Sequence, residues 1–348
     1  MGSITLPAII EGDPNITNAT CLEDLTFQDL YFDSKGMAMI RGLETNLFEK
    51  TPPLTGVPLG VLPDLNRLIE KTYDTGLSLG TDRFFIEHMG QRFRSQRMDT
   101  VNGVCYTLRL TMQPPRLSSF RGLQPAVQKT LILMGSGQAP AIGSGLIMIV
   151  GETASGKTTF GYSLVQEYLI RFGNIAVSME DPVEVNMTGG YGNNCHGWFY
   201  QQDINGLGWD NAMEIAMRET PRIIYIGEIR SKQAAMRALE ASLNGHIIIS
   251  TMHSDSPINA INRLITLSDD KDLARQTLAS GISAVIHQKL IRNKGMAGKY
   301  LEQDCLFFDR NAGPRGMIRD NITHQLSTTI QQQKSLILKG EFPVFHDN

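Results

Sequence analysis

The sequence predicts an α/β protein in which a small α+β domain precedes a larger domain with a parallel sheet. In the larger part of the chain, continuous apolar runs alternate with helical patterns, which is typical of parallel strands covered on both faces. In the first part, short β-like runs accompany a single helical stretch. Gln113-Pro114-Pro115 lies between the two patterns, and its prolines interrupt both a helix and a strand ladder.

These observations divide the 348 residues into four parts, because a chain of this length is long for one core. We expect a loose polar leader over 1–20, an N-terminal α+β domain over 21–112 and a linker over 113–124. The remaining residues, 125–348, form the larger domain, which ends in an extension of helices and strands.

Apolar periodicity predicts the elements of both domains. In the N-terminal domain we expect a helix over 63–78 and strands over 30–33, 37–41, 83–87, 92–97 and 103–111. In the larger domain we expect strands over 146–150, 175–179, 222–227 and 246–251. Helices are expected there over 125–133, 157–171, 209–219, 232–243, 256–267 and 270–290, with a glycine- and asparagine-rich loop over 188–208.

A phosphate-binding loop follows the strand 146–150 directly. The segment reads Gly151-Glu-Thr153-Ala154-Ser155-Gly156-Lys157-Thr158-Thr159, and a helical pattern begins at Lys157. Glycines allow the backbone to wrap around an anion, and the N–H groups of the turn and of the helix start face the phosphates. Lys157 is expected to reach the β- and γ-phosphates, and the Thr158 hydroxyl to hold Mg²⁺. A chance glycine-rich turn is the alternative, but the preceding strand favours a site for a nucleoside triphosphate such as ATP.

Acidic residues and a histidine follow the other strands. In an open parallel sheet, ligands bind at the carboxyl ends of the strands, which places Glu180, Glu228 and His253 at the edge of the phosphate-binding loop. Glu228 is expected to polarise the attacking water or to hold the metal through its hydration shell. Its alternative role is to cap the helix that starts near Ser231. His246 and His253 flank the strand 246–251, and either a γ-phosphate contact or a local backbone contact is compatible with them.

The N-terminal domain contains the densest basic run of the chain, Arg92-Phe-Arg94-Ser-Gln-Arg97, and Arg109 lies downstream. In a strand, Arg92 and Arg94 share one face and Arg97 lies on the other. These arginines either form a solvated strand face or reach a phosphate, which suits the planar guanidinium.

Composition and charge exclude several classes of function. The net charge is −3 and the pI is about 6.2, so no overall basic field favours direct binding of nucleic acid. Four scattered cysteines lack zinc-ligand spacing and fit reduced thiols. The N-terminus has no signal-peptide pattern, and no apolar run approaches the roughly 20 residues of a transmembrane helix. We therefore expect a cytoplasmic protein, and we expect any association with a membrane to be peripheral and to go through a protein partner.

From about residue 80 to 330, the chain resembles the traffic ATPases of type II and type IV secretion and of type IV pili. The resemblance rests on five boxes in family order, which are Gly151–Thr159, Met179–Glu184, Arg218 with Pro221, Ile226–Arg230, and Gly245–Ser254. The absence of a tetracysteine site argues against the extension-motor branch of the family. The short N-terminal domain is similar to pilus-retraction motors and to the Dot/Icm-type (IVB) secretion and conjugation ATPases, and the segment 300–309 resembles the latter most.

This resemblance implies a hexameric ring whose subunits pair a PAS-like N-terminal domain with a RecA-like P-loop (Walker A) ATPase domain. It implies a site for ATP and Mg²⁺ in which Glu228 activates water, Glu180 is a second catalytic acid and His253 contacts the γ-phosphate. Arg94 and Arg109 match arginines that complete the site. Arg218 and His246 fall in the family's boxes and join the expected catalytic set. The partners implied are further copies of the chain and inner-membrane secretion or pilus machinery.

Two departures leave other functions open. Asn102 stands where pilus-retraction members often have a further arginine, and Ser231 replaces an aspartate that commonly follows the Glu228 box. The alternatives to a motor are a nucleotide-binding structural or regulatory ring component with little turnover, and a nucleic-acid-dependent RecA-type motor.

Overall fold

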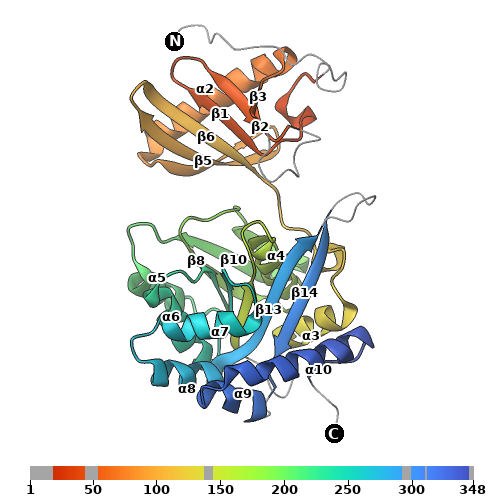
Figure 1. Ribbon diagram of the computed structural model, residues 1–348. Helices are drawn as coiled ribbons and strands as arrows, with labels where there is room; N and C mark the ends of the chain where they lie inside the picture. Colours follow the sequence, from red (N-terminus) through yellow and green to blue (C-terminus); the bar gives the residue numbers. More distant parts are fainter. Residues whose placement is uncertain (1–18, 44–53, 137–143, 292–298, 310–311, 345–348) are drawn as a thin grey trace. The chain divides into compact units, whose positions relative to one another are not determined.

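The structure is a computed structural model that describes the chain except for residues 1–18, 44–53, 137–143, 292–298, 310–311 and 345–348 (Figure 1). The chain divides into two compact units. The first contains residues up to Gln113 together with Glu184–Asn186, and the second contains Pro114–Val183 and the residues from Met187 onward. Most of the expected leader lies outside the described residues, whereas Ala19 is buried in the core of the first unit.

The first unit is an antiparallel sheet with a long helix packed against it. Its strand order is β3-β2-β1-β6-β5-β4, and every neighbouring pair is antiparallel. The strands are β1 (Asp29–Asp33), β2 (Ala38–Arg41), β3 (Leu54–Gly56), β4 (Arg83–His88), β5 (Gln91–Thr100) and β6 (Gly103–Thr111). Helix α2 (Leu62–Leu79) has a proline in its first turn and ends at Gly80, whose left-handed conformation has φ 60°. The short helices η1 (Leu22–Asp24) and η3 (Leu59–Val61) complete the unit.

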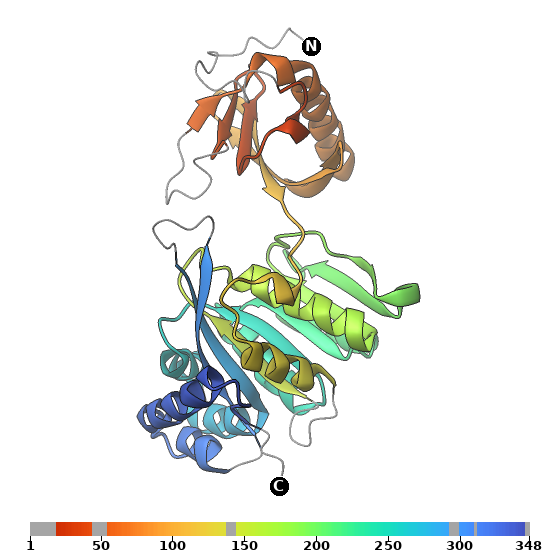
Figure 2. The ribbon, with the colours of Figure 1, turned by 90° about the vertical axis from the view of Figure 1, so that its right-hand side faces the viewer.

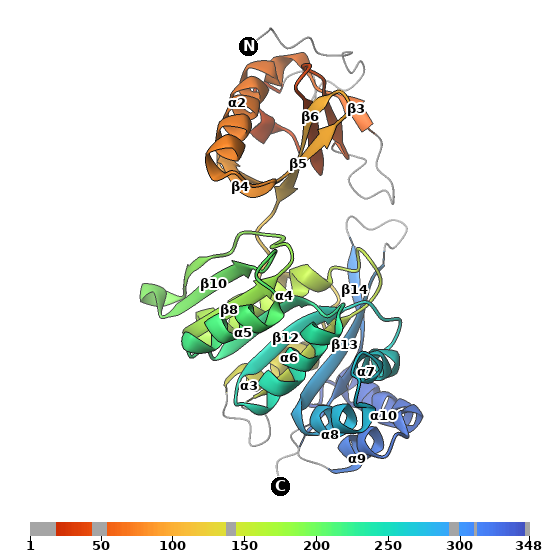
Figure 3. The ribbon, with the colours of Figure 1, turned by 90° about the vertical axis from the view of Figure 1, so that its left-hand side faces the viewer.

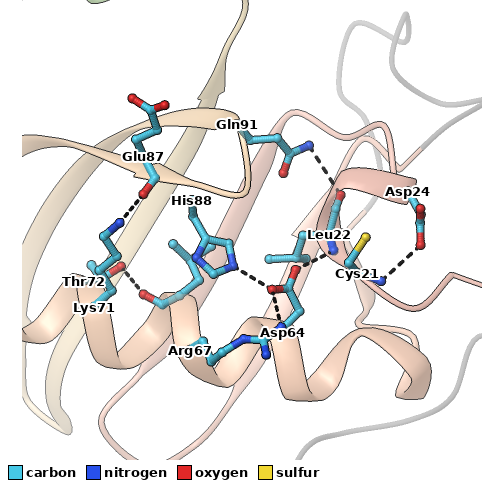
Figure 4. Close-up of polar contacts among 11 residues, drawn as sticks. Cys21, Leu22, Asp24, Asp64, Arg67, Lys71, Thr72, Glu87, His88 and Gln91 are labelled. Carbon is cyan, nitrogen blue, oxygen red and sulfur yellow. Dashed lines mark hydrogen bonds and ion pairs between the residues drawn. The ribbon is translucent and has the colours of Figure 1, made fainter.

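A buried carboxylate joins three segments of the first unit (Figure 4). Asp64 on α2 is 1% exposed and accepts hydrogen bonds from Leu22 N (2.8 Å), His88 Nε2 (2.7 Å) and Arg67 Nη2 (3.1 Å). Burial by itself favours the neutral acid, but these three donors outweigh it, so the pKa of Asp64 lies below its ordinary value. The ionised carboxylate therefore holds η1 and the end of β4 against α2.

We expect Asp64→Asn to lower the free energy of opening of the first unit at pH 7 by about 2 kcal/mol, because a neutral amide replaces a charged acceptor of three hydrogen bonds. The folded pKa is depressed, so this stabilisation is present above the unfolded pKa and is lost as the pH falls through the folded one. Hydrogen exchange of the α2 amides measures the change. Asp74→Asn, at an exposed position of the same helix, is the control, and equal protection in both variants would contradict the prediction.

The second unit is built on an eight-stranded sheet with the order β14-β13-β7-β12-β11-β8-β10-β9. The neighbours from β13 to β10 are parallel, and each edge strand is antiparallel to the strand beside it. The strands are β7 (Gly145–Val150), β8 (Asn174–Glu180), β9 (Gly189–Tyr191), β10 (Gly197–Asp203), β11 (Ile223–Glu228), β12 (Ile247–Met252), β13 (Ile282–Ile291) and β14 (Tyr300–Phe307). All six residues of β7 are buried, as expected for the centre of a covered sheet.

Helices cover both faces of this sheet. Figure 2 shows α3 and α4 on one face, and Figure 3 shows α5 and α6 on the other. The α-helices are α3 (Pro125–Ser136), α4 (Lys157–Phe172), α5 (Trp209–Arg218), α6 (Lys232–Leu243), α7 (Pro257–Thr266), α8 (Lys271–Gly281), α9 (Ala312–Arg319) and α10 (Leu326–Leu338). Short helices η4 (Leu117–Ser119), η5 (Asn193–Cys195) and η6 (Thr323–Gln325) lie between them. The largest core cluster joins the sheet to α5–α10.

Two predictions of local structure were wrong. The expected helix 270–290 ends at Gly281, and the rest is the buried strand β13, because periodicity alone does not distinguish a short apolar strand from a buried helix. The expected loop 188–208 contains β9 and β10. Strand β10 alternates buried and exposed residues at its start, but its glycine- and asparagine-rich surroundings obscured this pattern. Strand β14 also had no counterpart among the expected elements.

Among the residues that the structure describes, no helix combines the length and the apolar character needed to cross a bilayer.

Candidate nucleotide-binding site

The phosphate-binding loop leaves the carboxyl end of β7 in the middle of the sheet. Val150, the last residue of β7, pairs with Met252 of β12 on one side and with His287 of β13 on the other. The backbone turns sharply in the loop, where Gly156 has φ 81° and Ala154 has φ 62°. A left-handed backbone conformation is energetically unfavourable for any residue that has a Cβ atom, such as Ala154. Residues in this conformation are concentrated at ligand-binding sites. Lys157 then begins α4 as the sequence predicted.

The ammonium group of Lys157 is held by the loop itself. Lys157 is 7% exposed, and its Nζ donates to the carbonyl oxygens of Gly151 (2.9 Å) and Glu152 (2.7 Å). The two carbonyls hold the Nζ atom at the loop, and a lysine ammonium is a donor of charge-assisted hydrogen bonds to phosphate oxygens.

The remaining loop residues fit a phosphate and a metal ion. Thr158 is half-buried in the first turn of α4, while Thr153, Ala154 and Thr159 are exposed. The first N–H groups of a helix lack acceptors within the helix, so the start of α4 offers donors to an anion. The Thr158 hydroxyl is an oxygen ligand of the kind Mg²⁺ accepts, alongside water and substrate phosphates.

Glu228 and His253 meet the loop at this edge. Glu228 ends β11 with a side chain that is 19% exposed, and its Oε1 lies 3.9 Å from His253 Nε2. The same nitrogen lies 3.4 Å from the Thr153 hydroxyl of the loop. Glu228 also forms an ion pair with Arg230. A carboxylate, an imidazole and the loop therefore face a common space.

The alternative role of Glu228 as a helix cap belongs to another residue. Ser231 is the N-cap of α6, and its side chain accepts a hydrogen bond from Ala234 N. The serine that departs from the family pattern thus supplies the cap, and Glu228 is left at the sheet edge.

The protonation of His253 follows from its surroundings. Partial burial, and then the charge of Lys157, lower the pKa of His253, whereas Glu228 opposes the shift. The imidazole is consequently neutral at pH 7 and has one donor and one acceptor nitrogen. A neutral donor near the loop suits a contact to a terminal phosphate.

Glu180 lies at the end of β8 in a closed environment. It is 2% exposed, its Oε2 accepts a hydrogen bond from the Tyr162 hydroxyl, and its Oε1 accepts one from Gln201 Nε2 (3.1 Å). Gly227 leaves room for it, because a Cβ there would lie 3.2 Å from Glu180 Cγ. The Glu180 carboxylate is therefore held by a hydrogen bond on each of its oxygens. The glycine before Glu228 is needed because a side chain at position 227 would crowd Glu180.

The structure does not bring two of the expected catalytic residues to this edge. His246 precedes β12 at the amino end of the strand, and its Nδ1 is 2.6 Å from the carbonyl oxygen of Pro221. Arg218 ends α5 ahead of β11, where it is exposed and paired with Glu214. Both lie on the sheet edge opposite the loop, because parallel strands run from that edge to the other. Their inclusion in the expected catalytic set rested on the family's boxes alone, and their catalytic role stays a prediction.

Arg94 and Arg109 lie on neighbouring strands of the first unit, where they are paired in register. Arg109 Nε donates to Asp29 Oδ1 at 2.7 Å, and Arg41 Nη2 lies 2.8 Å from the other oxygen of the same carboxylate. Asp29 is 1% exposed, and its buried carboxylate holds the Nε end of the Arg109 guanidinium in place. Arg92 and Arg94 lie in β5 on either side of the buried Phe93, so the alternation of the strand places them on one face and Arg97 on the other, as predicted.

Sequence reasoning missed several residues that contact Glu180 or the loop. Tyr162 and Gln201 carried no motif, and Gln288 lay in a segment predicted to be helical. An open hollow of about 510 Å³ also adjoins His253, lined by Glu152, His253, Ser254, Asp255, Asn259 and Arg263. Arg263 Nη1 donates to the carbonyl of His253 at 2.9 Å and so fixes the backbone of that histidine. These residues could have been found only from their positions on strands and helices close to the loop. Those positions follow from the order of the strands in the sheet, which the sequence alone does not give.

Comparison with known proteins decides the family. Residues 83–335, well over half of the chain, match the model of the Type II/IV secretion system protein family. The chain belongs to this family. The resemblance inferred from the sequence boxes is therefore confirmed.

Curated relatives in the family share part of their length with the chain. The protein transport protein HofB homolog of Haemophilus influenzae is 33% identical over 178 residues, which cover 50% of this chain and 35% of that protein. A twitching motility protein of Neisseria gonorrhoeae is 25% identical over 191 residues, which cover 54% of this chain and 49% of that protein. The chain thus spans a third to a half of these relatives.

Solved structures share the fold of this family member. The pilus retraction motor PilT with bound ADP has a TM-score of 0.68 at 22% identity and covers 89% of this chain and 87% of its own. The Legionella pneumophila ATPase DotB has a TM-score of 0.64 at 20% identity and covers 91% and 89%. The predicted fold class, a RecA-like domain with a parallel sheet after a small α+β domain, is confirmed.

Proposed function

We propose that this family member is an ATPase that binds ATP with Mg²⁺ on residues 151–158 and hydrolyses it at the carboxyl edge of the sheet. The observation that carries the proposal is the convergence of Lys157, Thr153, His253 and Glu228 at that edge. In this arrangement Lys157 neutralises phosphate charge, His253 donates to the terminal phosphate and Glu228 polarises the attacking water. Thr158 is the residue that would hold Mg²⁺, and the ion would supply further neutralisation of phosphate charge.

The wider proposal is a motor that acts as a ring of six copies. Arg94 and Arg109 complete the nucleotide site, and the ring associates peripherally with the cytoplasmic face of inner-membrane machinery for secretion, conjugation or type IV pili. Membership of the secretion family supports this role, and the structural likeness to PilT and DotB supports a subunit built like a retraction or Dot/Icm-type motor.

Phosphate release from Mg-ATP by the purified full chain tests the enzymatic proposal. Steady release that requires Mg²⁺ supports it, and absence of both release and nucleotide binding overturns it. Light scattering with and without ATP tests the ring, and a monomer under both conditions contradicts it. Stimulation by added DNA would instead favour a nucleic-acid-dependent motor.

One observation favours a second candidate, a ring component that binds nucleotide with little turnover. Both oxygens of Glu180 are already bonded to Tyr162 and Gln201, so this acid is held in a protein contact. Nucleotide binding without phosphate release, both alone and with the membrane machinery, would support this candidate over the motor.

A further inference from the structure

Gln288 is a buried amide that contacts the phosphate-binding loop from the neighbouring strand. It lies on β13, is 0% exposed and donates from Nε2 to the carbonyl oxygen of Ser155 at 2.7 Å. Its Oε1 is buried without a hydrogen-bond partner among the described residues. Burying an amide whose oxygen has no hydrogen-bond partner costs free energy. The hydrogen bond from Nε2 to Ser155 is the contact that offsets part of this cost.

The two glycines that frame the loop fit around the same residue. A Cβ on Gly151 would lie 2.4 Å from the carbonyl oxygen of Gln288, which no packing adjustment of a side chain relieves. A Cβ on Gly156 would lie 3.2 Å from Leu290 and 3.4 Å from Gln288 Nε2, and Gly156 is left-handed as well. Strand β13 therefore contacts the loop at its beginning and at its end.

The hydrogen bond to Ser155 sets the direction of a donor. In a trans peptide, the carbonyl of one residue and the N–H of the next point in opposite directions. When Gln288 holds the Ser155 carbonyl toward β13, the Gly156 N–H points away from β13. The loop N–H groups are the ones that bind phosphate oxygens, so this peptide must have one orientation for the donor to be available.

We infer that Gln288 is a positioning residue that fixes the Ser155–Gly156 peptide so that the Gly156 N–H is presented to a bound phosphate. This inference rests on the proposed nucleotide binding. Gln288 acts through the loop and does not contact the substrate. Its contribution is to nucleotide affinity, and the hydrolysis step itself uses other groups.

The test is nucleotide affinity of the full-length Gln288→Met variant, which keeps the length and approximate volume of the side chain but has no donor. We expect the Kd for ADP and for ATP to rise together by about tenfold, the scale of one lost hydrogen bond to a charged group. The KM for ATP rises by a similar factor, while kcat at saturating ATP stays within about twofold. Gln288→Leu gives the same result by a second route if the methionine variant does not fold.

Two other glutamines serve as matched controls. Gln303 on β14 pairs with Gln288 in register, and both its amide atoms are buried without partners in the described part of the chain. Gln333 on α10 accepts a hydrogen bond from the Phe307 N–H and donates one to the Phe307 carbonyl, each at 2.8 Å. Neither of these hydrogen bonds involves the phosphate-binding loop. Gln303→Met is expected to keep its affinity, and Gln333→Met to lower the melting temperature with unchanged affinity.

The outcomes separate the inference from the function on which it rests. If the unaltered protein binds neither ADP nor ATP, the proposed function fails. If it binds both and Gln288→Met binds them equally well, the inference fails alone. An equal loss of affinity in Gln333→Met would show a general effect of stability and would also overturn it.

Discussion

Glu228→Gln is expected to retain ATP binding and to lose phosphate release by at least about 100-fold, the lower range for removal of a general base. The amide keeps the shape of the side chain but does not accept a proton from water. Glu228 is placed for this role at the end of β11, where its Oε1 is 3.9 Å from His253 Nε2, and that nitrogen lies 3.4 Å from the Thr153 hydroxyl of the loop. Binding of a fluorescent nucleotide and phosphate release, measured on the same preparation, separate the two effects.

Glu240→Gln is the matched control for this experiment. Glu240 lies on α6, is half exposed and pairs with Arg237, so the substitution removes an ion pair of similar kind at a distance from the loop. Exposed pairs contribute little to stability, and this variant should hydrolyse ATP normally. Normal turnover by Glu228→Gln would remove Glu228 from the mechanism, and lost binding would assign it to the nucleotide or its metal.

The sequence predicted the centre of the fold well, because the local signals there agree with the global arrangement. The strand before Gly151, the glycines and the helix from Lys157 are contiguous in the chain, so periodicity and turn chemistry determine them together. Glu228 and His253 were also placed correctly at the loop's edge, since parallel strands share a direction and end at the same edge of the sheet. Strand order was not needed for either conclusion.

Interactions between strands distant in sequence could not be predicted in this way. Gln288 contacts Ser155, 133 residues earlier, only because β13 is the neighbour of β7. Gln201 bonds Glu180 only because β10 adds to the sheet beside β8, in a segment read as a loop. Asp29 binds Arg109 across two strands of the first unit, and no motif marks that aspartate. Each of these contacts depends on sheet order, which periodicity does not encode.

Lys157→Ala is expected to weaken nucleotide binding by at least about 100-fold, because several charge-assisted hydrogen bonds are lost at once and each contributes about 1.5–3 kcal/mol. The ammonium contributes twice in this structure. It bonds the carbonyls of Gly151 and Glu152, whose negative dipoles would otherwise face a bound anion, and we expect its positive charge to attract the phosphates. Isothermal titration with ADP and with Mg-ATP measures the loss.

The matched control is Lys232→Ala, because Lys232 is also the first residue of an α-helix but is only half-buried and is paired with Asp269. A general effect of removing a lysine at a helix start would weaken binding equally in both variants and would contradict a specific role for Lys157. The two variants share the helix position and the type of substitution. A loss of nucleotide affinity in Lys157→Ala alone would therefore be due to the buried ammonium of the loop. That result would also explain why Lys157 is buried at all: the cost of removing an ammonium from water is offset at this position by loop carbonyls and, when nucleotide binds, by the phosphates.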